Sequence, residues 1–112
     1  MYIYVYLSDM KNNSSIYQKF LPKILPKKFP EINGVKVWTY KRGVFSFVYV
    51  IDIYFISNFE IENCENYIIE IGTEIESLLK YFNTNESLDI RLHNSDGKVI
   101  CKGSYYKPNL YY

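Results

Sequence analysis

The chain has 112 residues and a net charge of +1, and aromatic residues make up 19% of it. A chain of this length is expected to form one domain, residues 1–112, with a core that needs no disulfide or metal. The small net charge excludes a strong global field that would drive the chain onto nucleic acid or an anionic membrane. Lys and Arg are concentrated in the first half and Glu in the second, which predicts a polarised surface.

Three stretches of the first half have the composition of β-strands. Residues 2–7 alternate strictly between Tyr and aliphatic side chains, and residues 35–40 alternate after the turn signal Asn33–Gly34. Residues 44–56 are β-branched and aromatic almost throughout, which predicts a long strand.

The segment between the first two predicted strands combines helical spacing with proline. Residues 16–25 have apolar side chains at helical intervals, but Pro22 lies among them and Pro26 and Pro30 follow. Because proline lacks a backbone N–H and clashes with the preceding turn, we expect a short, broken helix followed by irregular backbone.

The second half contains the clearest helical pattern of the chain. Ser57 and Glu60 have the spacing of a capping box, and apolar residues then recur every three or four positions as far as Phe82. This predicts one long helix over residues 58–82. Residues 88–93 and 99–102 then form two strands, joined by a turn-forming stretch.

The order of elements predicts an α+β fold. It is β-α-β-β-α-β with an extra C-terminal strand, and the first six elements match the ferredoxin-like pattern over residues 2 to about 93. We expect an antiparallel or mixed sheet with the long helix packed on one face.

Strand alternation divides the sheet residues between two faces. The side expected to face the helix is aliphatic: Ile3, Val5, Leu7, Val35, Val37, Val44, Val48, Val50, Leu88, Ile90 and Leu92. The opposite side collects large aromatic residues: Tyr2, Tyr4, Tyr6, Trp38, Tyr40, Phe45, Phe47 and Tyr49. Lys36, Arg91 and His93 lie among them. Since exposed aromatic patches mark interfaces, we interpret this face as a partner-binding surface.

The sequence leaves three alternatives for what covers the aromatic face. The C-terminal residues 103–112 or the proline segment 22–30 can fold over it, a second copy of the protein can cover it, or a distinct protein can bind there. A second surface is acidic and lies on the long helix. It contains Glu62, Glu65, Glu70, Glu74 and Glu76, which form either a solvated face or a contact for a basic partner.

Two strands also carry residues like those of an RNA-binding family. Residues 3–7 resemble the first signature of the RNA-recognition motif, and residues 42–48 resemble the second, with Val44 as an extra residue between Gly43 and Phe45. The resemblance implies single-stranded RNA or DNA stacked on the sheet aromatics.

The sequence offers little catalytic chemistry. His93 is the single histidine and has no identifiable nucleophile as its partner. Asp52 shares the parity of Val48 and Val50, which predicts the helix-covered face, with exposure near the end of a strand that outruns the sheet as the alternative. Cys64 and Cys101 form no paired motif, so we interpret them as buried thiols and expect no metal site and no cofactor.

Together these patterns predict a non-enzymatic protein-binding module of the inhibitor, immunity or accessory type. It would act through the aromatic face, the acidic helix or both, on another protein or on itself. Single-stranded nucleic acid binding is the alternative, and a small enzyme comes third. The chain start has no basic segment and no apolar stretch is long enough to span a bilayer, which predicts a cytoplasmic protein without a membrane partner.

Overall fold

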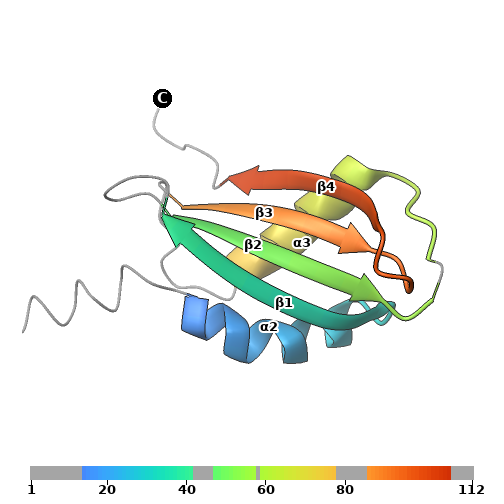
Figure 1. Cartoon of the computed structure of the whole chain (residues 1–112), viewed down its shortest axis with the longest axis horizontal. Helices are drawn as coiled ribbons and strands as arrows, with labels where there is room; N and C mark the ends of the chain where they lie inside the picture. The colour runs from blue at the N-terminus through green and yellow to red at the C-terminus, as the bar shows by residue number, and fades with distance from the viewer. Residues whose placement is uncertain (1–13, 42–46, 58, 78–85, 107–112) are drawn as a thin grey trace, which may run out of the picture.

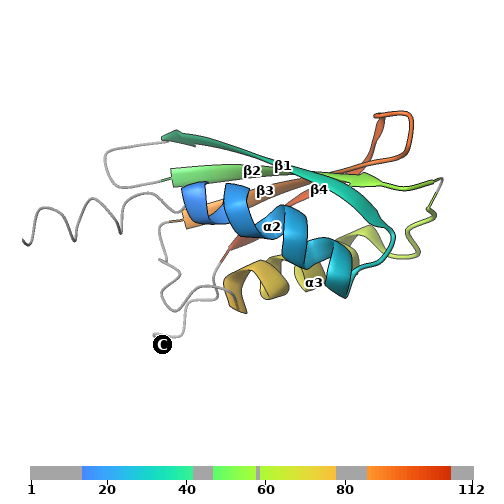
Figure 2. The same cartoon turned by 90° about the horizontal axis from the view of Figure 1, so that it is seen from below.

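A four-stranded sheet carries two helices on one of its faces (Figures 1 and 2). The computed structural model describes residues 14–41, 47–57, 59–77 and 86–106. Its elements are α2 (Ser14–Lys28), β1 (Ile32–Lys41), β2 (Phe47–Phe55), α3 (Cys64–Ser77), β3 (Glu86–His93) and β4 (Val99–Tyr106). The predicted α+β class is confirmed. The strand predicted at residues 2–7 lies outside the described residues.

The strands follow one another across the sheet in the order β1-β2-β3-β4. β1 and β2 pair antiparallel, as do β3 and β4, whereas β2 and β3 pair in parallel. A ferredoxin-like sheet would place the predicted first strand between β2 and β3. Here those two strands are bonded directly to each other, from the Phe47–Glu86 pair to the Tyr54–His93 pair. The ferredoxin-like order is therefore not confirmed.

The two faces of β2 are the reverse of the sequence prediction. Tyr49 and Ile51 are fully buried beneath the helices, while Val48 and Val50 belong to the opposite face. The antiparallel register places Ile51 beside Val37, which sets this phase. Asp52 is the single charged residue of β2, and the sequence prediction gave more weight to its apolar neighbours Val48 and Val50 when it assigned the parity that faces the core. For β1 and β3 the predicted inward residues are confirmed as core: Val35, Val37, Leu88, Ile90 and Leu92.

Helix α2 is continuous through two prolines, so the expected broken helix is wrong. Tyr17, Leu21 and Leu25, spaced four residues apart, are fully buried. Pro22 is exposed, one position away from the stripe, and Pro26 is half-buried. Burial of the stripe against the sheet supplies the free energy that offsets the backbone bonds lost at the prolines.

Helix α3 begins six residues later than the predicted start. Its N-terminus is capped by Asn63, whose side-chain Oδ1 accepts a bond of 3.0 Å from the backbone N–H of Asn66. Ser57 instead closes a local turn, with its carbonyl 2.7 Å from the Phe59 N–H. The sequence predicted one short, broken helix and one long helix, but α2 has 15 residues and the described part of α3 has 14. Residues 78–82 of the predicted long helix lie outside the described residues.

A disulfide joins α3 to β4, and it overturns the interpretation of two free thiols. Cys64 and Cys101 are bonded, with their Cα atoms 5.9 Å apart. Cys64 is exposed at the first turn of α3, while Cys101 faces the core from β4. The two residues are 37 positions apart, and only the packing of α3 onto β4 brings them together.

The close approach of α3 to β4 depends on Gly72. A Cβ atom at this position would overlap Cγ of Tyr105 and lie 2.8 Å from its Cβ. We expect Gly72→Ala to lower the free energy of unfolding by about 2 kcal/mol, because the rigid base of the tyrosine must shift, although alanine favours helix by about 1 kcal/mol. Chemical denaturation measures the change.

Two further variants make the Gly72 prediction specific. Gly34→Ala is the matched control, since a Cβ there meets nothing within 4 Å. When Tyr105 is also replaced by Ala, the added Gly72→Ala change should cost less, because the ring is removed and only the contact with the Cβ of residue 105 remains. A Gly72→Ala protein as stable as the wild type would contradict the close packing.

Candidate functional site

A carboxylate anchors a polar cluster on the sheet face opposite the helices. Asp52 of β2 is only 3% exposed. Arg91 of β3 donates from Nε to Asp52 Oδ1 at 2.7 Å and from Nη2 to Oδ2 at 2.8 Å. The indole Nε1–H of Trp38, on β1, donates to Oδ2 at 2.9 Å. The carboxylate therefore ties together side chains from three neighbouring strands.

The cluster is built to hold Asp52 in its charged form. Burial raises the pKa of the carboxyl, but hydrogen bonds from Arg91, His93 and Trp38 together outweigh burial and leave the pKa below its ordinary value. The guanidinium of Arg91 responds in the opposite direction, since the bond to Asp52 raises its pKa.

The imidazole of His93 is engaged at both nitrogens. Nε2 lies 2.9 Å from Asp52 Oδ1, and Nδ1 lies 3.1 Å from the carbonyl oxygen of Gly97. Both neighbours are hydrogen-bond acceptors, so each ring nitrogen faces a protein oxygen. Tyr54 stacks on the ring at 4.4 Å between centroids. The arrangement fixes the histidine and leaves neither nitrogen for proton transfer.

The structure places the predicted aromatic residues in different environments. Trp38 lies on the open face and is 56% exposed, and Lys36, Arg91 and His93 share that face as predicted. Tyr49 does not, because it is buried in the core against Tyr17 with ring centroids 4.9 Å apart. The other predicted positions lie outside the described side chains: Tyr2, Tyr4, Tyr6, Tyr40, Phe45 and Phe47.

Asp52 is the residue that sequence reasoning misplaced. It was expected on the helix-covered face, but the register sets it opposite Lys36 on β1 and Arg91 on β3. The same shift by one position brings Tyr54 to the open face. Asp52 was the single charge in a long apolar strand, and such a residue signals a paired carboxylate. Because the sequence analysis assigned the wrong face to the residues of β2, it did not place Asp52 beside Trp38 and Arg91.

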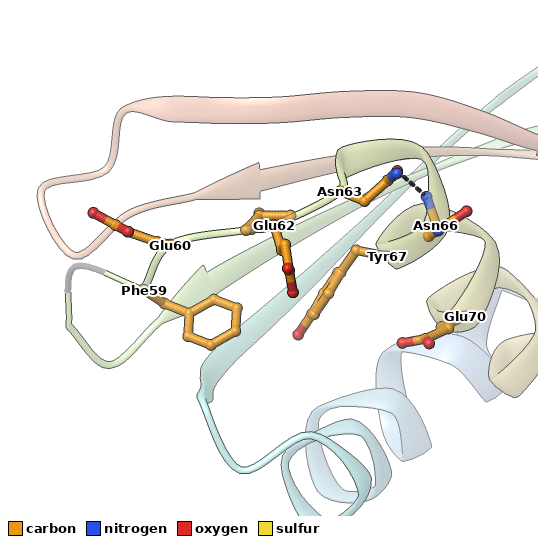
Figure 3. Close-up of a pocket in the computed structure, with 8 residues that line it drawn as sticks. Phe59, Glu60, Glu62, Asn63, Asn66, Tyr67 and Glu70 are labelled. Carbon is orange, nitrogen blue, oxygen red and sulfur yellow. Dashed lines mark hydrogen bonds between the residues drawn. The ribbon is translucent and has the colours of Figure 1, made fainter.

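The predicted acidic surface is divided between different neighbours. Glu62 and Glu70 line a pocket of about 560 Å³ beside the start of α3 (Figure 3), whereas Glu65 lies by β4. Glu76 accepts a bond of 2.6 Å from the hydroxyl of Tyr105. Glu74 is half-buried on α3.

The pocket of Figure 3 joins aromatic and acidic side chains. Figure 3 shows Phe59 and Tyr67 near one another with the Glu62 side chain between them, and the two ring centroids are 6.0 Å apart. The Tyr67 hydroxyl donates to Glu31 at 2.5 Å. Burial, then this bond and the charges of Glu31 and Glu70, raise the pKa of Tyr67 well above its ordinary value.

Two further observations limit the chemistry of the described residues. Nowhere in residues 14–41, 47–57, 59–77 and 86–106 do three His, Cys, Asp or Glu side chains gather in a way that could hold a metal ion. Neither α2 nor α3 has the length and apolar character needed to cross a membrane.

No protein-family model, curated protein or solved structure matches the chain.

Proposed function

We propose that the chain is a non-enzymatic protein-binding module of the inhibitor, immunity or accessory type, and that it binds through the open sheet face. One observation carries the proposal: the nearly buried Asp52 holds an exposed tryptophan and a half-exposed arginine on a face that no described element covers.

The residue types on this face are those that dominate protein interfaces. Tryptophan and arginine are enriched among the residues that contribute most to binding. The side chain of Trp38 is fixed by its indole bond, and Arg91, whose side chain is 44% exposed, is fixed by two bonds. Because both side chains are already ordered, less conformational entropy is lost when a partner binds.

The polar cluster itself argues for binding rather than catalysis. His93 has acceptors at both nitrogens, and the four donors around Asp52 saturate its oxygens. Neither group is left to accept a proton from a substrate. The cluster therefore fits an ordered recognition surface.

Single-stranded nucleic acid is the second candidate. The exposed ring of Trp38 beside Lys36 and Arg91 supports it, since bases stack on aromatics next to cations. The ring of Tyr54, however, already stacks on His93. Trp38 is then the one exposed aromatic ring among the described side chains of this face, which favours a protein partner.

The proposed function is tested by Trp38→Ser. We expect this substitution to weaken partner binding or self-association by about 30-fold or more, because a central exposed tryptophan typically contributes more than 2 kcal/mol. Phe20→Ser is the matched control, since Phe20 is an exposed ring on α2, away from the open face. Proteins retained from the source cell by each immobilised variant are compared, and sedimentation reports the dimer.

Circular dichroism of the Trp38→Ser protein completes the test. A folded variant that retains every partner and the oligomeric state of the wild type would contradict the proposal. An unfolded variant would also contradict it, because it would assign Trp38 to the stability of the fold.

A cytoplasmic location, expected from the sequence, remains a proposal, and the Cys64–Cys101 bond weighs against it. Disulfides persist in oxidising compartments and are rare where thiols are kept reduced.

A further inference from the structure

The open face carries a straight row of charged residues across the sheet. The strand register aligns Lys36 with Asp52, Asp52 with Arg91, and Arg91 with Lys102. Neighbouring strands are about 4.8 Å apart, so the row spans about 14 Å from edge to edge. Three of its four members are cations.

The carboxylate in this row cannot neutralise the outer lysines. Its two oxygens already receive donors from Arg91, Trp38 and His93, which fills the capacity of a carboxylate. The Lys36 ammonium lies instead over the Tyr54 ring, 5.7 Å from the centroid. Lys102 is exposed at the β4 end of the row.

Arg91 has N–H donors that its bonds to Asp52 do not use. It uses Nε and one Nη2 hydrogen for Asp52, while a guanidinium has five N–H donors. Its Nη1 edge is therefore available to a second acceptor, and the row as a whole carries more positive than negative charge. Trp38 stands beside the row, and since its N–H is occupied, it offers a partner only its apolar ring.

We infer that the partner of this face is a protein segment that presents carboxylates. Its Asp or Glu side chains pair with Lys36, Arg91 and Lys102, and an apolar residue beside them packs on Trp38. This inference rests on the proposed function and names the chemistry of the partner. Charge complementarity selects the acidic segment, and the ordered arginine favours the planar geometry of a carboxylate.

A second carboxylate beside the row, on β3, argues against a nucleic-acid strand. Asp89 lies on the same face, where its carboxylate accepts a bond of 2.8 Å from Ser104. A polyphosphate backbone that ran beside Arg91 and Lys102 on this side of the row would meet this second carboxylate. Separate carboxylates on a protein can be spaced to avoid it, whereas phosphates recur at every nucleotide.

The test selects binders from a random displayed peptide library on the folded full chain. Clones that also bind Trp38→Ser are discarded, and the remaining peptides are synthesised and titrated. Because Trp38 is the single tryptophan, its indole N–H signal reports directly on the site. We expect the Trp38-dependent peptides to be acidic, and their binding to weaken as the salt concentration rises.

Matched double variants then test the row itself. Lys36→Gln with Lys102→Gln should lower the affinity of these peptides by about tenfold. Lys23→Gln with Lys27→Gln removes the same charge from exposed positions of α2 and should leave the affinity unchanged.

Three outcomes would overturn the inference. Trp38-dependent peptides that are neutral or basic would contradict the acidic partner while leaving the proposed function in place. A library that yields no Trp38-dependent peptide would overturn both. An oligothymidylate that shifts the Trp38 indole signal and binds more tightly than the selected peptides would assign the face to nucleic acid.

Discussion

Removal of the Cys64–Cys101 bond by Cys64→Ala is expected to lower the free energy of unfolding by about 4 kcal/mol. The bond closes a loop across 37 positions, and the chain entropy that it removes from the unfolded state grows with the length of that loop. A domain of this size has only about 5–15 kcal/mol of total stability. The variant should therefore unfold at a clearly lower denaturant concentration.

Reductant separates the bond from other effects of the substitution. Dithiothreitol should destabilise the wild type by a similar amount and leave the Cys64→Ala and Cys101→Ala double variant unchanged. If the wild type unfolds at the same denaturant concentration with and without reductant, and its free thiols titrate before reduction, the predicted cross-link is contradicted.

Replacement of Asp52 by Asn is expected to lower the free energy of unfolding by about 3 kcal/mol. The amide has one acceptor oxygen where the carboxylate has two, so it cannot accept all the bonds that Arg91 and His93 donate, and the side chain is only 3% exposed at this position. The charged guanidinium of Arg91 would then lose its counterion. Urea denaturation at neutral pH measures the loss.

Asp96→Asn is the control for Asp52→Asn. Asp96 is exposed in the turn between β3 and β4, and substitutions at such sites usually change stability by less than about 0.5 kcal/mol. Equal effects of the two substitutions would contradict the anchoring role of Asp52.

The pH dependence of stability provides a second measure of Asp52. Its pKa in the folded protein is lower than the ordinary value of 3.8. The resulting stabilisation is fully present above that ordinary pKa and is lost as the pH falls through it toward the lower folded value. The wild type should therefore lose stability in acid more steeply than Asp52→Asn, as measured by denaturation at a series of pH values.

Sequence pattern predicted the strands whose two faces differ in polarity. In β3, Leu88 and Ile90 alternate with Asp89 and Arg91, so both the strand and its inward face were predicted correctly. In β2 every position from Phe47 to Ile51 is apolar, so the strand was predicted while its phase was not. One wrong phase moved Asp52 to the wrong side of the sheet and concealed the cluster with Trp38.

The other discrepancies arise from tertiary contacts that local rules do not contain. Proline rules predicted a broken helix at Pro22, but burial of the Tyr17, Leu21 and Leu25 stripe outweighs the missing backbone bonds. The disulfide left no local signal, because its two cysteines meet only after α3 has packed on β4. The direct pairing of β2 with β3 likewise depends on the path of the connection between them.

That parallel pairing also has a consequence for how the chain folds. The β1–β2 and β3–β4 pairs are hairpins between consecutive strands, and each can form from contacts that are close in the chain. The contact of β2 with β3 joins Phe47 to Glu86 across α3 and its connections. Since distant contacts form slowly, we expect the two hairpins to form early. The parallel pairing of β2 with β3, which joins one hairpin to the other, should then limit the folding rate.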